Sequence, residues 1–232
     1  MIPRTGPQRK KRTSPGRPGG ESFAREDILD AAEETFAEHG FAGTSLREIA
    51  MRANVTQALV TYYFGAKEAL FRDVFLRRGH SIAAARLEAL DALLASNRRL
   101  TLEAVVRAYL GPALALRRTS QSRTFIRLQA RMHTEPPRFG EQLRRDVYDN
   151  VAHRYVAAMR RSLPSLSART AYWRMVLVVG AYMYVHADSH RLERISGGRC
   201  DPENLDEMLE QITAFVVGGM SAPEPRRSVP RR

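Results

Sequence analysis

Residues 44–68, with the sequence TSLREIAMRANVTQALVTYYFGAKE, decide the fold of this chain, because they predict two short helices joined by a tight turn. Ser45 and Glu48 have the spacing of a capping box, which predicts that a first helix begins at about Leu46. This helix is expected to run to about Ala53. Its apolar side chains recur at helical spacing on one face, at Leu46, Ile49, Ala50 and Ala53.

A turn and a second helix follow. Asn54 is predicted to make the turn, because after glycine it is the residue that best tolerates a left-handed backbone. Thr56 can cap the second helix, and Gly65 can end it just after Phe64. Val60 and Phe64 are expected to face inward, which leaves an outer face of Gln57, Ala58, Thr61 and Tyr62. This order is typical of a helix-turn-helix, whose second helix lies in the major groove of DNA.

The same residues resemble a known family. VTQALVTYYFGAKEAL (55–70) is similar to the recognition-helix region of the TetR (tetracycline-repressor) family, and so is ILDAAEETFAEHGFAGTSLREIA (28–50). The match covers about residues 24–70 and departs at Asn54, where the family usually has Gly, and at Thr61, where Tyr is common. The resemblance implies an all-α protein, in which a three-helix DNA-binding domain precedes a larger helical domain for ligand binding and dimerisation.

Roles in DNA binding can be assigned to the exposed side chains. Gln57 can read a base edge, and Thr61 can contact a base edge or a thymine methyl. Phosphate contacts, which position the protein without reading sequence, are expected from Thr44, Arg47, Tyr62, Tyr63 and Lys67. The predicted DNA-binding set is Thr44, Ser45, Arg47, Thr56, Gln57, Ala58, Thr61, Tyr62, Tyr63 and Lys67.

The charge of the chain supports a polyanionic partner. The formal net charge is +12 and the pI about 10.6. Residues 1–20 hold six Lys and Arg and no acid (+6), and residues 221–232 hold four Arg and one Glu (+3), so the tails carry most of the excess. We therefore expect a disordered basic arm at 1–21, a DNA-binding domain at 22–70, an effector and dimerisation domain at 71–220, and a basic tail at 221–232. The arm can contact phosphates or the minor groove, or be a solvated tail.

Beyond residue 66 the sequence predicts helices with short breaks and no strands. Expected spans are 66–95, as one helix or two joined near Gly79, then 100–116 with a kink or break at Gly111-Pro112, 121–132, 139–162, 168–188 and 202–217. The last two are apolar enough to pack against a second copy, although they could also simply close the monomer core. The predicted homodimer interface is Val176, Val179, Gly180, Met183, Leu205, Met208, Leu209, Ile212 and Val216.

Residues 80–165 are expected to hold an effector pocket if the family resemblance applies. The candidates are Tyr109, Phe125, Arg127, Leu128, Met132 and His133, each of which could equally be plain core or surface. Arg127 and His133 could anchor an anionic ligand head. Residues 163–215 resemble, more loosely, the C-terminal domain of a fatty-acid-responsive subgroup, which implies a hydrophobic effector that is fatty-acid or acyl derived.

Other classes of function find little support in the sequence. No catalytic motif stands out, so we expect no enzyme and no cofactor. The single thiol, Cys200, cannot form an internal disulfide, and His186 and His190 have metal-ligand spacing but no evident third ligand. Nothing resembles a signal peptide or a spanning helix, which predicts a cytoplasmic protein. The expected function is a repressor that binds a palindromic operator as a dimer and is released by an effector. An activator, or a nonspecific architectural protein, is the alternative.

Overall fold

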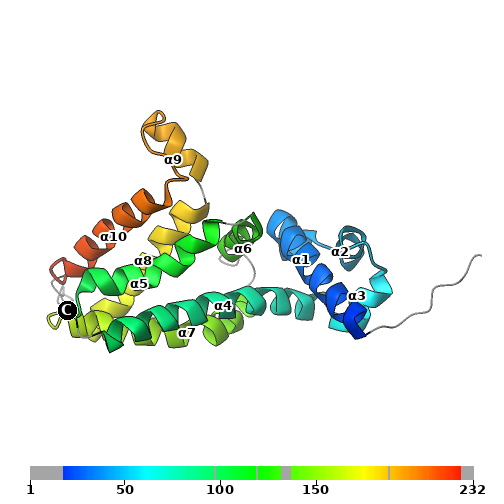
Figure 1. The fold of residues 1–232 in the computed structure, drawn as a ribbon, viewed down its shortest axis with the longest axis horizontal. Helices are drawn as coiled ribbons and strands as arrows, with labels where there is room; N and C mark the ends of the chain where they lie inside the picture. The colour runs from blue at the N-terminus through cyan, green and yellow to red at the C-terminus, as the bar shows by residue number, and fades with distance from the viewer. Residues whose placement is uncertain (1–17, 97, 119, 132–136, 188, 226–232) are drawn as a thin grey trace, which may run out of the picture.

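The computed structural model describes residues 18–96, 98–118, 120–131, 137–187 and 189–225, and these residues form helices without any strand (Figure 1). The all-α prediction is confirmed. Residues 1–17 and 226–232 lie outside the described residues, so most of the basic arm and most of the basic tail remain predictions. No helix in the described ranges combines the length and the apolar character that crossing a bilayer requires.

Three helices form one end of the molecule: α1 (Pro18–Gly43), α2 (Leu46–Arg52) and α3 (Gln57–Phe64) (Figure 1). Gly40 interrupts the helical backbone of α1 with a φ of 72°, a left-handed value that favours glycine. Phe36 is fully buried, and its ring meets that of Phe71 edge to face at a centroid distance of 4.9 Å. This contact fixes α1 against the first turns of the long helix α4 (Lys67–Ala95).

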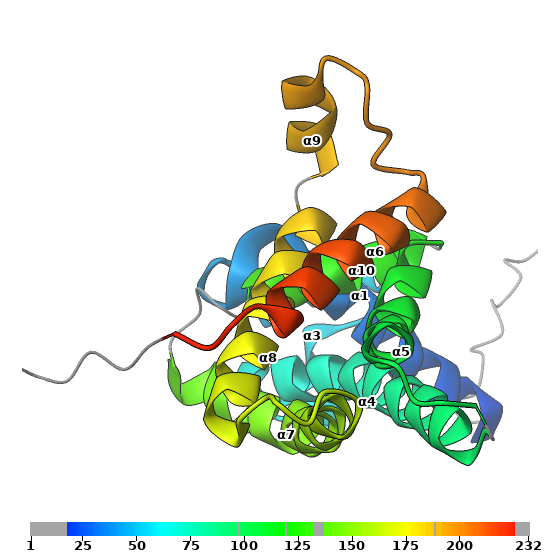
Figure 2. The same cartoon turned by 90° about the vertical axis from the view of Figure 1, so that its left-hand side faces the viewer.

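The remaining helices form the body of the molecule. Helix α4 runs from the three-helix end along the body, with α7 beside it, and α10 crosses α5 and α8 (Figures 1 and 2). The boundary predicted at residue 70 falls inside α4, which both parts of the chain therefore share. The helices of the body are α4 (Lys67–Ala95), α5 (Leu102–Ala115), α6 (Ser120–Arg131), α7 (Pro137–Ser162), α8 (Ala168–Ala187), α9 (Ser189–Ser196) and α10 (Leu205–Ser221).

Of the two alternatives for residues 66–95, one continuous helix is confirmed. Helix α4 continues through Gly79, where an added Cβ would lie 2.9 Å from Val147 Cγ1. The glycine therefore allows α4 and α7 to approach each other closely, and it does not join two helices. Helix α5 contains Pro112 without ending there, so of the kink or break predicted at Gly111-Pro112 the break is wrong, and the kink remains a prediction.

The end of the chain differs from the prediction in two places. Helix α10 begins at Leu205 and not at Pro202, because the side chain of Asn204 accepts a hydrogen bond from Glu207 N at 3.2 Å and so caps the helix. Helix α9 was not predicted at all. It stands out from the body in Figures 1 and 2, and its side chain at Ile195 is 68% exposed.

Candidate DNA-binding surface, core cavity and apolar face

Local hydrogen bonds build the two short helices as the sequence predicts. Ser45 Oγ accepts from Glu48 N at 3.2 Å, and Thr56 Oγ1 accepts from Leu59 N at 3.2 Å. Asn54 adopts a φ of 54°, and it is the only described residue other than glycine with positive φ. Both caps and the left-handed turn are therefore confirmed.

The outer face of α3 is open to solvent. Val60 is fully buried and Phe64 is 7% exposed, as predicted, and they hold α3 against the domain. Tyr62 is 77% exposed, and its ring meets that of Tyr63 edge to face at 5.3 Å. The other exposed members of the predicted set are Ser45, Arg47, Thr56, Gln57, Ala58 and Thr61. The structure thus leaves these side chains available to DNA, and their individual contacts remain predictions.

Thr44 and Lys67 have structural roles that the sequence did not reveal. The buried Thr44 hydroxyl donates to Gly40 O at 2.8 Å, so a phosphate contact by this side chain is wrong. Lys67 Nζ donates to Phe41 O at 2.9 Å and to Thr44 O at 2.8 Å, and it lies 4.4 Å from the centroid of the Phe41 ring. Because the ammonium is engaged with these carbonyls, we remove Lys67 from the phosphate contacts.

Ion pairs connect the DNA-binding end to α4. Glu33 of α1 is 1% exposed, and its Oε2 lies 2.9 Å from Arg77 Nη2 and 3.0 Å from Arg78 Nε. Asp30 adds a contact of 2.7 Å to Arg77 Nη2. Helix α6 is joined to α1 as well, because Arg131 Nη2 donates to Glu38 O at 2.8 Å. Both α4 and α6 are therefore bonded directly to α1.

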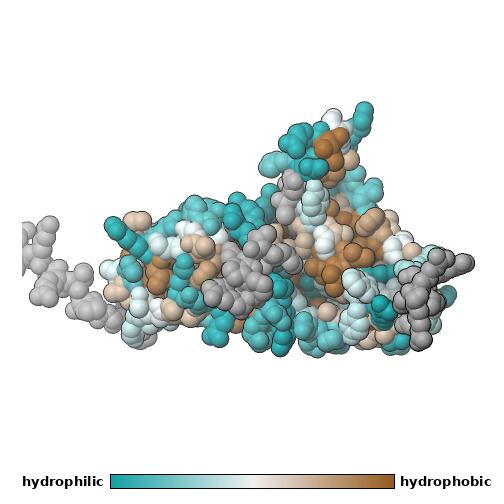
Figure 3. All heavy atoms as spheres, turned by 180° about the vertical axis from the view of Figure 1, so that it is seen from behind, coloured by the Kyte–Doolittle hydropathy of each residue, from teal (hydrophilic) through white to brown (hydrophobic). Residues whose placement is uncertain are grey.

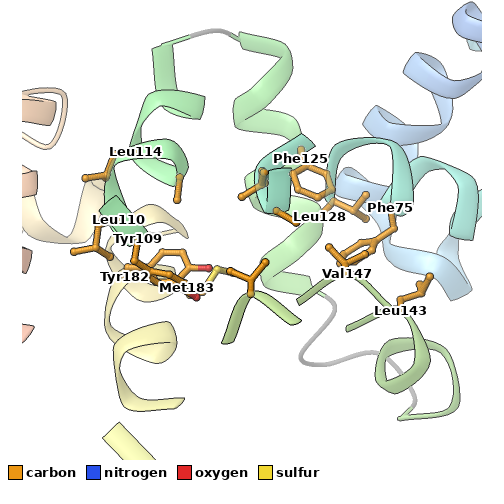
Figure 4. Packing of buried hydrophobic residues seen from close by; sticks show 14 of the residues in the cluster. Phe75, Tyr109, Leu110, Leu114, Phe125, Leu128, Leu143, Val147, Tyr182 and Met183 are labelled. Atoms are coloured by element: carbon orange, nitrogen blue, oxygen red, sulfur yellow. The ribbon is translucent and has the colours of Figure 1, made fainter. Parts of the chain in front are cut away.

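A cavity of about 340 Å³ lies in the body among α4, α5, α6, α7 and α8. Figure 4 shows Tyr109, Tyr182 and Met183, which line this cavity, gathered at one side of the core, with Phe75 near Phe125 and Leu128 at the other. Most of the lining is apolar or aromatic. Its apolar members include Phe75, Val151, Met175, Val179 and Met183.

The structure places the predicted pocket residues in different surroundings, and a role in effector binding remains a prediction. Tyr109 lines the cavity. Phe125 and Leu128 are buried in the hydrophobic core and lie outside the lining, and the ring of Phe125 packs 5.7 Å from that of Phe75. Arg127 is exposed, so its predicted role as an anion anchor in the pocket is wrong. Met132 and His133 lie outside the described residues.

The sequence analysis missed Arg86, which lines the cavity and is 1% exposed. Arg86 Nε donates to Tyr109 O at 3.0 Å, and its guanidinium carbon lies 3.9 Å from the centroid of the Tyr109 ring. A signal was present, because Arg86 falls on the same helical face as Ile82 and Leu90. A charged side chain within such an apolar stripe either extends to solvent or is buried where it has a partner or a function.

The predicted dimer interface divides between the core and the surface. Met183, Met208, Ile212 and Val216 are buried within the monomer, because α10 packs on α5 and α8. Those four assignments to the interface are wrong in the described chain. Val176 and Gly180 are exposed, and Val179, Leu205 and Leu209 are half-buried.

A different set of apolar side chains is exposed on the same two helices. Seen from behind in Figure 3, hydrophobic residues gather on the body below α9. We call Trp173, Val176, Leu177, Tyr184 and Phe215 the apolar face; their exposed fractions run from 57% at Tyr184 to 72% at Phe215. Leu177 and Phe215 line one groove of about 280 Å³ between α8 and α10. Isolated apolar residues on a surface are normal, whereas a contiguous set marks a candidate interface.

His186, His190 and Cys200 are the possible metal or disulfide residues that the sequence indicates. His190 is exposed, and the side chain of His186 lies outside the described residues. Among described residues no group of three His, Cys, Asp or Glu side chains is placed to hold a metal ion. Cys200 is half-buried, and its backbone N–H donates to Ser196 Oγ at 3.2 Å.

Comparison with protein families places these features together. Residues 28–74, which contain α2 and α3, match the family model described as bacterial regulatory proteins of the tetR family. Residues 107–219 match a second model, described as a tetracyclin repressor-like C-terminal domain. The chain belongs to the TetR family.

Individual relatives match short stretches of this TetR-family chain. The transcriptional regulator RutR of Escherichia coli is 46% identical over 50 residues, which are 22% of this chain and 24% of RutR. The probable acrEF/envCD operon repressor of Escherichia coli is 35% identical over 54 residues, 23% of this chain and 24% of that protein. The chain thus matches about a quarter of the length of these relatives.

Structural similarity extends over nearly the whole chain. The solved structure of the fatty acid degradation regulator FadR from Bacillus halodurans has a TM-score of 0.62 and 15% sequence identity, and the match covers 92% of this chain and all of that one. At this identity the likeness shows the fold alone. The TetR-family architecture therefore includes both the three-helix end and the body.

Proposed function

We propose that this TetR-family chain is a cytoplasmic transcriptional repressor that binds a palindromic operator as a homodimer and is released by a small hydrophobic effector. The observation that carries the proposal is the outer face of α3. Gln57, Thr61 and Tyr62 are exposed there, while the opposite face of the helix is fixed by Val60 and Phe64. A rigid helix with a free polar face is what reading of the major groove requires.

The dimer follows from the geometry of operator binding. Two recognition helices that read half-sites one turn of DNA apart, about 34 Å, require a two-fold assembly. The apolar face on α8 and α10 supports this arrangement, because a second copy would cover Leu177 and Phe215 and fill the groove between them. Neither helix lies at the DNA-binding end in Figure 1, so α3 would stay free in both copies.

The cavity supports release by a ligand. Its volume of about 340 Å³ lies within the ordinary range for small-molecule sites. A fatty-acid or acyl-derived effector fits the apolar lining, and it fits the resemblance of residues 163–215 to a fatty-acid-responsive subgroup. FadR from Bacillus halodurans shares this fold and is named as a fatty acid degradation regulator.

Helices α4 and α6 could carry the response to the DNA-binding end. Helix α4 places Phe75 on the cavity and Arg77 on Glu33 of α1. On α6, Gln129 lines the cavity and donates to Tyr148 Oη at 2.7 Å, two residues before the Arg131 contact to α1. A ligand shifts the equilibrium only if it binds the released state more tightly than the operator-bound state.

The test is a gel shift with DNA from beside the gene against random competitor DNA. We expect saturable binding to one palindrome, and Gln57→Ala should weaken it by about 1–3 kcal/mol at one base pair and relax the preference there. Gln211→Ala, at an exposed position on α10, is the matched control and should bind as the wild type does. Equal loss on operator and random DNA would remove Gln57 from base reading.

The same experiment separates the alternatives. Uniform affinity for all DNA would support a nonspecific architectural protein, which would act through its basic tails. An activator would bind the same palindrome, and a transcription reporter would then rise with the protein present. Neither alternative is favoured by a specific feature of the structure.

A further inference from the structure

Arg86 is a buried cation to which the described residues supply no anionic partner. It is 1% exposed, and no carboxylate of the described residues forms an ion pair with it. Its Nη2 atom is buried with no hydrogen-bond partner in the described chain. Since arginine stays protonated in proteins, the positive charge persists inside the core. A buried charge of this kind is strongly unfavourable unless something pairs with it.

The surrounding tyrosines lessen this cost but do not neutralise the charge. The guanidinium lies over the Tyr109 ring at 3.9 Å and near the Tyr182 ring at 5.3 Å, and the Tyr182 side chain is also a hydrogen-bond partner. Burial raises the pKa of Tyr109 and of Tyr148 well above the ordinary tyrosine value. Their hydroxyls therefore stay protonated and neutral. The aromatic faces attract the cation only weakly, whereas a carboxylate would add a full opposite charge and charge-assisted hydrogen bonds.

A second buried arginine shows what a purely structural role looks like. Arg117 is 3% exposed, yet its Nη2 lies 2.8 Å from Glu203 Oε1. Among the residues that the structure describes, one buried guanidinium is thus paired with a carboxylate and the other is not. The difference is that Arg86 lines the cavity.

The rest of the lining fits an apolar molecule with one charged end. Side chains such as Phe75, Met175 and Val179 line the cavity around Arg86. The other charged groups of the lining are Asp149, which is exposed, and Arg144, which is half-buried. Because these two more exposed side chains carry opposite charges, together they favour neither an anionic nor a cationic ligand. Selection by charge is therefore assigned to Arg86.

We propose that Arg86 binds the carboxylate head of an apolar effector, whose hydrocarbon part lies along the apolar lining of the cavity. A planar guanidinium can hold a carboxylate through two parallel hydrogen bonds. The volume of about 340 Å³ has room for about eleven groups of the size of a water molecule, at roughly 30 Å³ each. The regulatory consequence rests on the proposed function above, but binding of the carboxylate does not depend on DNA.

The test compares three probes of equal chain length on the purified full chain by calorimetry: octanoate, octanol and octylamine. We expect octanoate to bind at least tenfold more tightly than either of the others. Arg86→Met, which keeps the apolar volume, should bring octanoate and octanol within twofold of each other, and Arg86→Lys should bind octanoate with intermediate affinity. Arg117→Met is the matched control and should keep the wild-type preference.

Two results would overturn the proposal: equal affinity of the wild-type protein for octanoate and octanol, or an Arg86→Met variant that retains the preference. If Arg86→Met does not fold, the proposal is tested by the affinities of the wild-type protein for octanoate and octanol and by the affinity of Arg86→Lys for octanoate. Operator binding by the ligand-free protein is measured separately by gel shift. If the ligand-free protein binds no operator, the proposed function is contradicted, but the measured preference for octanoate still tests the role of Arg86. Octanoate should reduce operator binding only when both proposals hold.

Discussion

Arg77 Nη2 on α4 lies 2.9 Å from Oε2 of Glu33 on α1, and the glutamate is 1% exposed. Arg78 Nε contacts the same oxygen at 3.0 Å, so one carboxylate oxygen holds two guanidinium groups. The pair joins the helix that supports the DNA-binding end to the helix that lines the cavity. Because Glu33 is withdrawn from water, removing its charge takes the buried anion from both guanidinium groups, although Arg77 keeps its contacts to Asp30 and Glu26.

Glu33→Gln should therefore lower the free energy of unfolding by about 3 kcal/mol. The amide keeps the shape of the side chain but leaves both arginines without their shared anion. Urea denaturation followed by circular dichroism measures the change. Glu26→Gln is the control, since Glu26 contacts Arg77 Nη1 at 3.0 Å from a half-exposed position and should change stability by less than about 1 kcal/mol. Equal effects of the two variants would contradict a special role for Glu33.

Lys67→Met should reduce stability without changing how DNA binding depends on salt. The variant loses two charge-assisted hydrogen bonds to Phe41 O and Thr44 O, for which we expect a loss of about 1–2 kcal/mol in the free energy of unfolding. Arg47→Ala, at an exposed position on α2, should instead keep its stability and lower the slope of log affinity against log salt by about 1. A reduced slope in Lys67→Met would return Lys67 to the phosphate contacts.

The turn at Asn54 can be tested by a matched pair of substitutions. At a φ of 54° a Cβ without a local polar side chain is strained, so Asn54→Ala should lose about 1 kcal/mol of unfolding free energy. Asn54→Gly removes the strain but adds freedom to the unfolded chain, and it should stay within about 0.5 kcal/mol of the wild type. Thermal and urea denaturation provide the measurement. A fully stable alanine variant would show that the turn does not constrain this residue.

Sequence reasoning succeeded where the signal is local. The caps at Ser45 and Thr56 and the left-handed Asn54 depend on residues within a few positions, and all three are confirmed. It failed where the outcome depends on distant partners. Whether Met208 faces a second copy or α5 is decided by packing between elements nearly a hundred residues apart.

Charged side chains show the same limit. Lys67 looks like a phosphate contact in sequence, but the carbonyls that accept from its ammonium belong to Phe41 in the last turn of α1 and to Thr44 just after that helix. Arg86 is distinguished only by its place in an apolar stripe of α4. The tyrosines that surround it come from α5, α7 and α8. Periodicity could therefore mark Arg86 as unusual, but it could not show the cavity.

The apolar face gives the last prediction. Leu177 and Phe215 are 66% and 72% exposed and line one groove between α8 and α10, so a charge there would be buried without a partner if a second copy covers the groove. Leu177→Glu or Phe215→Glu should therefore shift the protein from dimer to monomer in sedimentation equilibrium, and operator affinity should fall by more than tenfold because each half-site is then bound alone. Phe23→Glu is the control, since Phe23 is 74% exposed on α1, and it should leave the dimer intact. If both groove variants remain dimeric, the two copies must meet through another surface, and the spacing of their α3 helices would have to be derived from that surface instead.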